Sequence, residues 1–278
     1  MIKTNIWYIL WFGVYFNYSF YFLQSIFGAQ AFIINVLFYA FSLFVAHFFG
    51  DTIFKILEGA RILETKREKE YLLPLFEEVY QDVKELYPSL PKIKLHIVDT
   101  MTANAMAIGN HTVAVTQGAI DTFSAEELKG IIAHEISHIY YGDTKVAIIN
   151  TIGNGIFAVL TFFIKLFIRG LEYIAMMCES TVIQAVLNLL RYLLELCIFV
   201  MLWLGELILS FNSRSNELKA DKFAFDTGYG GQLTEALYII QKMSLGQKMK
   251  LVHKMIASHP RTSKRIGRLE ELEDQAII

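Results

Sequence analysis

The chain has 278 residues, of which 54% are hydrophobic and 19% are charged. Soluble domains contain about 45–50% apolar and about 25% charged residues. The excess of apolar residues is concentrated in a few segments, which indicates membrane-spanning helices rather than one soluble core. The net charge of -2 and the scattered positions of the basic residues argue against a nucleic-acid partner.

The first apolar segment, residues 4–50, contains no Asp, Glu, Lys or Arg. At a rise of about 1.5 Å per residue it is too long for one crossing of a bilayer, and it suits two crossings of about 20 residues each. We expect spans at 6–23 and 31–49, with a break at 24–30. Residues 1–50 would then form an N-terminal transmembrane hairpin.

A cleaved signal peptide is the alternative for this segment. Lys3 would be its positive end, and Ala29-Gln30-Ala31 would fit a cleavage site. The apolar run exceeds the length of about 7–15 residues that is usual for a signal peptide, and it is rich in Trp, Tyr and Phe. We therefore favour spans that are retained.

Basic residues predict the orientation of this hairpin. Lys3 precedes the first span, and the turn between the spans has no basic residue. Five basic residues lie within about 20 residues of the second span, namely Lys55, Arg61, Lys66, Arg67 and Lys69. The positive-inside rule then places both the N-terminus and the polar region after the hairpin in the cytoplasm. We expect a multi-pass protein of the plasma (inner) membrane.

A second apolar region covers residues 146–211. Its first half, 146–168, is long enough to span, whereas 181–210 is interrupted by three charged residues, Arg191, Glu195 and Glu206. Charges inside a span are costly and usually face protein or water. The region is therefore either a second transmembrane hairpin, which we favour, or two helices that lie partly in the interface. The linker at 170–180 carries no Lys or Arg and suits an external loop.

The polar segments 51–145 and 212–278 are expected to form one mostly helical domain in two parts. The composition of 67–87 predicts a helix, kinked or restarted at Pro74. Residues 92–98 alternate polar and apolar side chains, which predicts a half-buried strand. Residues 103–108 and 111–116 flank Gly109-Asn110 and predict a hairpin.

The sequence HEISH at residues 134–138 carries the chemistry. Ser124 and Glu127 form a capping box that predicts the start of a helix, which should end near Gly142. On that helix His134 and His138 lie on one face, where two imidazoles can bind one metal ion. Glu135 lies one step round the helix, within reach of a zinc-bound water whose proton it can accept. The alternative is a solvated helix that carries two histidines.

The third ligand of such a site must come from elsewhere in the chain. A metzincin would have Gly and His at the positions of Tyr141 and Thr144. The segment 214–221 instead offers Glu217 and Asp221 at i,i+4 on one helical face. Glu217 can bind zinc, while Asp221 can accept the second ring N–H of a zinc histidine. An ordinary charged helix face is the alternative for this pair.

These motifs, in this order, resemble the family of membrane-bound zinc peptidases that includes bacterial HtpX and, more distantly, the eukaryotic CAAX prenyl protease. The resemblance includes HEISH, the apolar hairpin, and the sequence SRSNELKAD at 213–221. It also includes NAMAIG at 104–109 and Ser258-His259-Pro260, with Arg265 six residues after His259. Arg261 stands where many relatives have a second proline.

The resemblance implies one Zn²⁺ per chain, bound by His134, His138 and Glu217, with Glu135 as general base and Asp221 behind the ligands. It implies that an extended substrate pairs with a strand that contains Asn104, Ala105, Met106 and Ala107. His259 and Arg265 would steady the oxyanion or the substrate. Alternatively, His259 only caps a helix and Arg265 only pairs with a nearby acid.

We therefore predict a mainly α integral membrane protein with about four transmembrane helices and a zincin-like α+β metalloprotease domain that contains a small β-sheet. Its expected function is zinc-dependent endopeptidase activity on polypeptides, in the quality control of misfolded or damaged membrane proteins. The bilayer is its other partner, and the sequence does not determine an oligomeric state. A catalytically silent zinc-binding membrane scaffold is the alternative, although Glu135 argues against it. A transporter is a weaker reading, because the spans hold few paired charges and more than half of the chain looks soluble.

Overall fold

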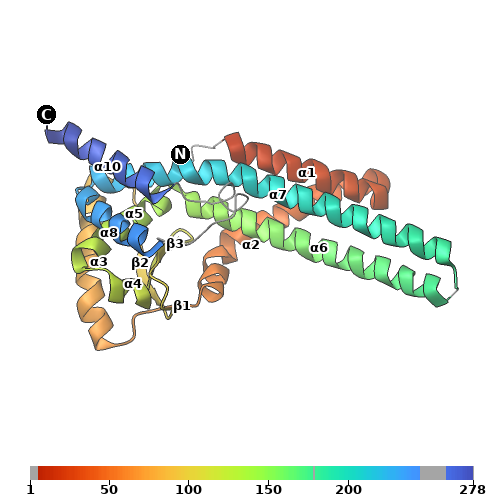
Figure 1. Ribbon diagram of the computed structural model, residues 1–278, viewed down its shortest axis with the longest axis horizontal. Helices are drawn as coiled ribbons and strands as arrows, with labels where there is room; N and C mark the ends of the chain where they lie inside the picture. The colour runs from red at the N-terminus through yellow and green to blue at the C-terminus, as the bar shows by residue number, and fades with distance from the viewer. Residues whose placement is uncertain (1–5, 178, 245–260, 278) are drawn as a thin grey trace.

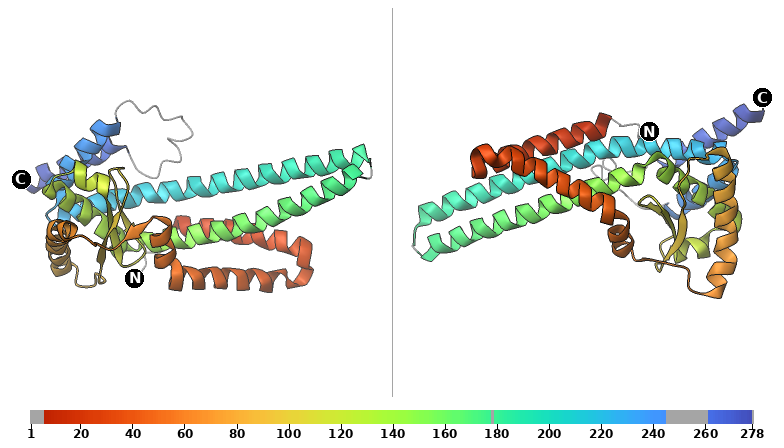
Figure 2. Two further views of the ribbon diagram at one scale, coloured as in Figure 1. Left: turned by 90° about the horizontal axis from the view of Figure 1, so that it is seen from below. Right: turned by 180° about the vertical axis from the view of Figure 1, so that it is seen from behind.

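The computed structural model describes residues 6–177, 179–244 and 261–277, and it is mostly helical with one small sheet. Four long helices form a rod that leaves one side of a compact domain (Figure 1). They are α1 (Ile6–Phe27), α2 (Ala31–Leu57), α6 (Asp143–Met177) and α7 (Thr181–Asp226). The 3-10 turn η1 (Gly28–Gln30) joins the first two helices. The α6–α7 hairpin extends farther from the domain than the α1–α2 hairpin (Figure 2).

The two hairpins pack side by side, with α2 against α6 and α1 against α7. Polar groups hold α1 to α2 inside an otherwise apolar pair of helices. Ser19 Oγ donates to Asn35 Oδ1 at 2.8 Å, and Asn35 Nδ2 donates to the carbonyl of Phe16 at 3.1 Å. Because such groups have no water to bind inside a bilayer, a partner on the facing helix is the stable arrangement.

Within the described residues, two helical segments are long and apolar enough to cross a membrane, Gly28–Leu57 and Thr181–Val200. This supports a membrane protein, and it supports two of the four expected spans rather than all four. The helices also continue past the expected limits of the apolar segments. Because α7 is one continuous helix, the expected boundary between residues 211 and 212 lies inside it.

The sheet has the strand order β1-β2-β4-β3, with β1 at Ala60–Arg61, β2 at Lys94–Val98, β3 at Ala105–Ile108 and β4 at Thr112–Thr116. β3 and β4 form the predicted antiparallel hairpin, while β2 runs parallel to β4. β3 is consequently an edge strand in the described part of the sheet.

The strand predicted at 92–98 is present as β2, but the expectation that it is half-buried is wrong, because four of its five residues are buried. Ile97 faces the main core of the domain. Val98 belongs to a smaller cluster on the same sheet, against which Phe54 of α2 packs. Both faces of β2 are therefore covered, and Phe54 near the end of α2 covers part of the face that carries Val98.

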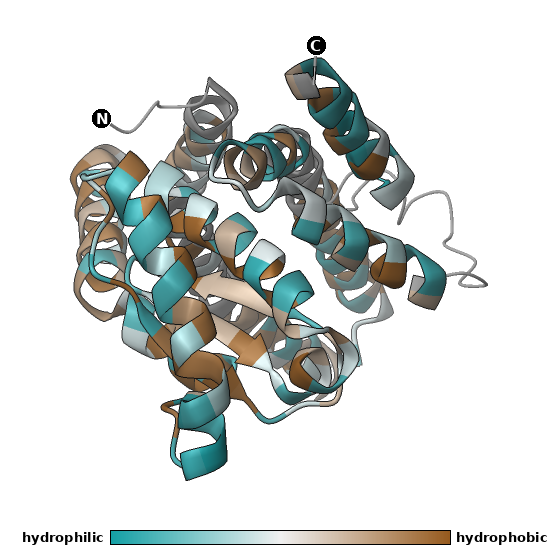
Figure 3. Cartoon of the chain, turned by 90° about the vertical axis from the view of Figure 1, so that its left-hand side faces the viewer, coloured by the Kyte–Doolittle hydropathy of each residue, from teal (hydrophilic) through white to brown (hydrophobic). Residues whose placement is uncertain are grey.

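In the part of the chain that the structure describes, five more helices belong to the domain, namely α3 (Lys66–Leu86), α4 (Gln117–Thr122), α5 (Ala125–Tyr141), α8 (Gly230–Ser244) and α10 (Thr262–Ile277). Pro74 lies inside α3, which continues through it as one helix. The largely hydrophilic α10 lies at the outer end of the domain (Figure 3).

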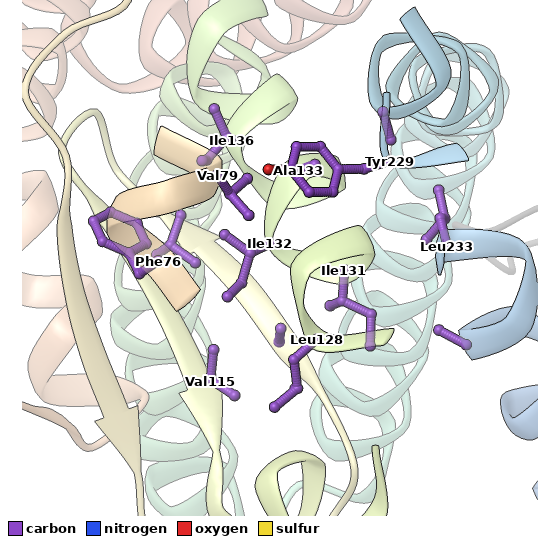
Figure 4. Close-up of a cluster of buried hydrophobic side chains, with 14 of the residues drawn as sticks. Phe76, Val79, Val115, Leu128, Ile131, Ile132, Ala133, Ile136, Tyr229 and Leu233 are labelled. Carbon is purple, nitrogen blue, oxygen red and sulfur yellow. The ribbon is translucent and has the colours of Figure 1, made fainter. Parts of the chain in front are cut away.

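Helix α5 lies at the centre of the core. Leu128, Ile132 and Ile136 are fully buried along it, and Phe76 and Val79 of α3 lie close by (Figure 4). On another side of α5 the backbone of α8 comes very close to Gly130. A Cβ at Gly130 would lie 2.4 Å from the backbone nitrogen of Leu233. The helix that carries HEISH is thus fixed by packing on several sides.

Candidate active site

The HEISH helix begins and ends where its sequence predicts. Ser124 Oγ accepts from the backbone N–H of Glu127 at 3.3 Å, and Glu127 Oε2 accepts from the backbone N–H of Ser124 at 2.7 Å. Gly142 ends the helix in the left-handed conformation, with φ of 78°. Between these ends, His134 is buried and His138 is half-buried.

The structure brings His134 and His138 together with Glu217 of α7. One potential ligand atom from each lies within 4.8 Å of the other two. His134 Nε2 is 3.5 Å from Glu217 Oε2, and His138 Nε2 is 3.6 Å from Glu217 Oε1. Zinc bonds of about 2.0–2.2 Å in a tetrahedral arrangement separate neighbouring ligand atoms by roughly 3.4 Å. Donor types and spacing therefore both fit a zinc ion.

Carboxylates hold the opposite ring nitrogen of each histidine. His134 Nδ1 is 3.1 Å from Asp221 Oδ1, and His138 Nδ1 is 2.9 Å from Asp143 Oδ2. Asn216 Nδ2 in turn donates to Asp143 Oδ1 at 2.7 Å. With each Nδ1–H donated to a carboxylate, each Nε2 is left with its lone pair toward the shared centre.

Asp143 and Asn216 are the two residues that the sequence analysis missed. The available signals were weak. Asp143 directly follows the helix-ending Gly142, and Asn216 directly precedes Glu217.

The electrostatics of the centre favour positive charge. Burial lowers the pKa of His134, as does the guanidinium of Arg265, but hydrogen bonds to Asp221 and Glu217 outweigh both effects and raise this pKa to about 9. The same carboxylates that attract a proton to the imidazole would attract a metal cation. The donor set thus has the charge as well as the spacing that a divalent ion requires.

Arg265 of α10 binds the carboxylates behind the centre. Its Nε and Nη2 donate to the two oxygens of Asp221 at 2.9 and 2.6 Å, and its Nη1 lies 3.2 Å from Glu217 Oε2. Burial acts to raise the pKa of Asp221, but the hydrogen bonds and positive charge of His134 and Arg265 outweigh this effect and bring the pKa below its ordinary value. Arg265 therefore contacts two acids of the site, and its Nη2 also lies 3.4 Å from His134 Nδ1. His259 lies outside the described residues.

Glu135 points to the edge strand β3. Its Oε2 accepts a hydrogen bond of 2.8 Å from the backbone N–H of Ala107. The expected substrate strand, from Asn104 through Ala105 and Met106 to Ala107, therefore runs along the HEISH helix. The expected general base and the expected peptide-binding edge lie on the same side of α5.

Comparison with known proteins agrees with this arrangement. The sequence model of peptidase family M48 matches residues 66–273. A "Protease HtpX homolog" of Methanocaldococcus jannaschii is 28% identical over 258 residues, which cover 82% of this chain and 84% of that protein. Another from Sulfurihydrogenibium sp. is 27% identical over 280 residues and covers 88% of each.

A solved structure shows the same fold. The crystal structure of S. mikatae Ste24p aligns with a TM-score of 0.50 and 19% identity, over 92% of this chain and 62% of that one. At this identity the likeness concerns the fold alone, and this chain spans less than two thirds of that longer protein. The family match covers both segments that converge on the centre, HEISH and the Glu217 region. The chain belongs to peptidase family M48 and is a metalloprotease similar to the HtpX proteases.

Proposed function

We propose that this metalloprotease is a zinc endopeptidase that holds one Zn²⁺ per chain through His134, His138 and Glu217. The observation that carries the proposal is the convergence of two Nε2 atoms on one carboxylate at 3.5 and 3.6 Å. A zinc ion bound there would supply Lewis acidity, lowering the pKa of a water molecule and polarising the scissile carbonyl.

The chain's own residues would perform the remaining steps. Glu135 would accept the water proton at its carboxylate and pass it to the leaving amine as the peptide bond breaks. Asp221 and Asp143 keep both imidazoles oriented through Nδ1. The edge of β3 would align an extended polypeptide by backbone hydrogen bonds, which requires Glu135 to leave the N–H of Ala107 when the peptide enters.

We infer a membrane setting for this chemistry. Four spans, α1, α2 and the apolar parts of α6 and α7, would cross the plasma membrane and leave the zinc centre on its cytoplasmic side. Substrates would be misfolded or damaged membrane proteins. The HtpX relatives, the two apolar segments and the excess of basic residues after the first hairpin support this setting.

Metal content and cleavage together test the proposed function. Purified protein should contain about one zinc per chain and cleave an unfolded polypeptide. Glu135→Ala should keep the zinc and reduce the cleavage rate at least on the order of 100-fold, the usual size of a general-base contribution. Glu126→Ala, which removes an exposed carboxylate from the same helix, is the matched control.

Equal cleavage by the wild type and Glu135→Ala would contradict the proposal. Zinc that is retained without any cleavage in the wild type would favour the silent scaffold instead.

A further inference from the structure

The turn between β3 and β4 is held by two of the long helices. Both carboxylate oxygens of Asp51, near the end of α2, accept from the backbone N–H of Asn110, at 3.3 and 3.1 Å. Thr144 Oγ1, at the start of α6, donates to the carbonyl oxygen of Gly109. The single peptide unit that joins Gly109 to Asn110 is therefore bound at its N–H by α2 and at its carbonyl by α6. We call this set of four residues the turn clasp.

The turn clasp is closely packed. Gly109 has φ of 62°, and a Cβ there would lie 2.0 Å from Asp51 Oδ1. One residue earlier on α2, a Cβ at Gly50 would lie 2.6 Å from Cγ2 of Ile148 on α6. Because both positions are glycine, the β3–β4 turn can pack directly against α2, and α2 can pack directly against α6. A change in how the two helices pack against each other would therefore displace the turn.

Gly109 of the turn clasp is two residues after Ala107, which lies on the edge of β3 that faces the active site. The N–H of Thr116 donates to the carbonyl of Asn104 at 3.0 Å, so Asn104 bonds toward β4. Bonding alternates along an antiparallel strand, and Ala105 and Ala107 therefore direct their N–H and C=O groups away from β4. The bond from the N–H of Ala107 to Glu135 agrees with this direction. These outward groups are the ones that an incoming strand would pair with.

We propose that Asp51 is a positioning residue for peptide binding. By holding the turn, it would keep the outward edge of β3 at the distance from α5 at which an extended polypeptide fits between the strand and the HEISH helix. It would also couple the packing of the membrane-proximal helices to the strength of peptide binding. This inference rests on the proposed function, because it concerns the same substrate edge.

A split between KM and kcat tests this role. In the full-length zinc-loaded protein, Asp51→Ala should raise KM for an extended unfolded peptide on the order of tenfold, the effect of losing a hydrogen bond to a charged acceptor. Both kcat and zinc content should change much less, because Asp51 touches neither Glu135 nor the histidines. Asp51→Asn keeps one acceptor oxygen and should give an intermediate KM.

Two further variants make the test specific. Thr144→Val removes the bond from α6 and should raise KM in the same direction. Glu58→Ala removes an exposed carboxylate about two turns farther along the chain from Asp51 and should leave KM and kcat unchanged. If Asp51→Ala fails to fold, Asp51→Asn and Thr144→Val decide the outcome.

Peptide binding without turnover separates this inference from the proposed function. The affinity of a labelled extended peptide is measured by fluorescence anisotropy in a Glu135→Ala background, with and without Asp51→Ala. Weaker binding with Asp51→Ala supports the positioning role, even if the wild type shows no cleavage and the proposed function fails. Equal binding, or a fall in kcat at unchanged KM, would overturn the positioning role while leaving the proposed function intact.

Discussion

At the scale of single residues, the two histidines of the centre have carboxylate partners from different places. Asp221 reaches His134 from the same helix that carries Glu217. Asp143 reaches His138 from the residue directly after Gly142, where α5 ends and α6 begins. The orientation of each imidazole therefore depends on a separate element, and the two can be perturbed separately.

Loss of Asp143 should weaken metal binding. Asp143→Ala removes the acceptor of His138 Nδ1, so the imidazole is no longer fixed with Nε2 toward the centre. We expect zinc affinity to fall about 10- to 100-fold, as is usual for such outer partners. Competition with a chelator of known affinity measures this change. Asp226→Ala, which removes an exposed acid of α7 paired with Lys222, is the control, and equal affinities in the two variants would refute the role of Asp143.

At the scale of elements, the start of α3 shows how one carboxylate serves several purposes. Glu68 completes a capping box with Thr65 at the first turn of the helix. It also pairs with Arg61 of β1, at 2.9 Å, and Arg61 binds Asp99 after β2 at 2.7 Å. Ion pairs through Arg61 thus link the start of α3 to β1 and to the residue that follows β2. The hydrogen bond from Arg61, with two backbone N–H groups, lowers the pKa of Glu68 to about 2.

This lowered pKa predicts a pH dependence of stability. A carboxylate whose pKa is about 2 when folded and near 4.5 when unfolded stabilises the fold above the unfolded value. That contribution is lost as the pH falls through 4.5 toward 2. The difference in unfolding midpoint between wild type and Glu68→Gln, measured in detergent, should therefore be largest at neutral pH and shrink in acid.

A matched variant checks that the pH-dependent stability arises from Glu68 and its ion pair with Arg61. Glu70→Gln removes a more exposed carboxylate of α3, whose observed ion pair is a 3.5 Å contact with Lys66. It should change the midpoint less than Glu68→Gln at neutral pH. A difference for Glu68→Gln that stays constant across the acid range would contradict the assignment.

At the scale of the whole molecule, two ion pairs join α6 to α7 in the far half of their hairpin. Arg191 pairs with Glu172 at 3.0 Å, and Lys165 lies 3.8 Å from Glu195. Apolar side chains such as that of Phe199 remain exposed on the outside. Arg191 and Glu195, two of the charges that interrupt the apolar sequence, thus pair across the hairpin, which is the arrangement that a lipid environment favours.

Cysteine labelling tests the proposed topology. In a chain whose two cysteines are replaced by serine, Ser180→Cys marks the tip between α6 and α7, and Ser89→Cys marks the exposed surface of the domain. A membrane-impermeant maleimide applied to intact cells should label only Ser180→Cys. Ser89→Cys should react after permeabilisation. Labelling of Ser89→Cys in intact cells would show that the domain faces outward and would contradict the proposed orientation.

Sequence reasoning worked best where a pattern is local. The capping box, the end of α5 at Gly142 and the β3–β4 hairpin lie where their residues predict. The i,i+4 spacing also singled out Glu217 and Asp221, because both lie on one face of any helix. Asp143 was missed because its approach to His138 depends on how the chain turns at Gly142 and continues into α6.

The sequence by itself therefore determined the helical periodicity, the apolar segments and the presence of two imidazoles on one helix face. Those properties follow from the repeat of a helix or strand and need no distant contact. Only the tertiary structure decided that Glu217, 79 positions after His138, completes the centre, that β2 runs parallel to β4, and that Asp51 holds the β3–β4 turn. These contacts join segments far apart in the chain, and their geometry depends on how the whole core and both helical hairpins pack together.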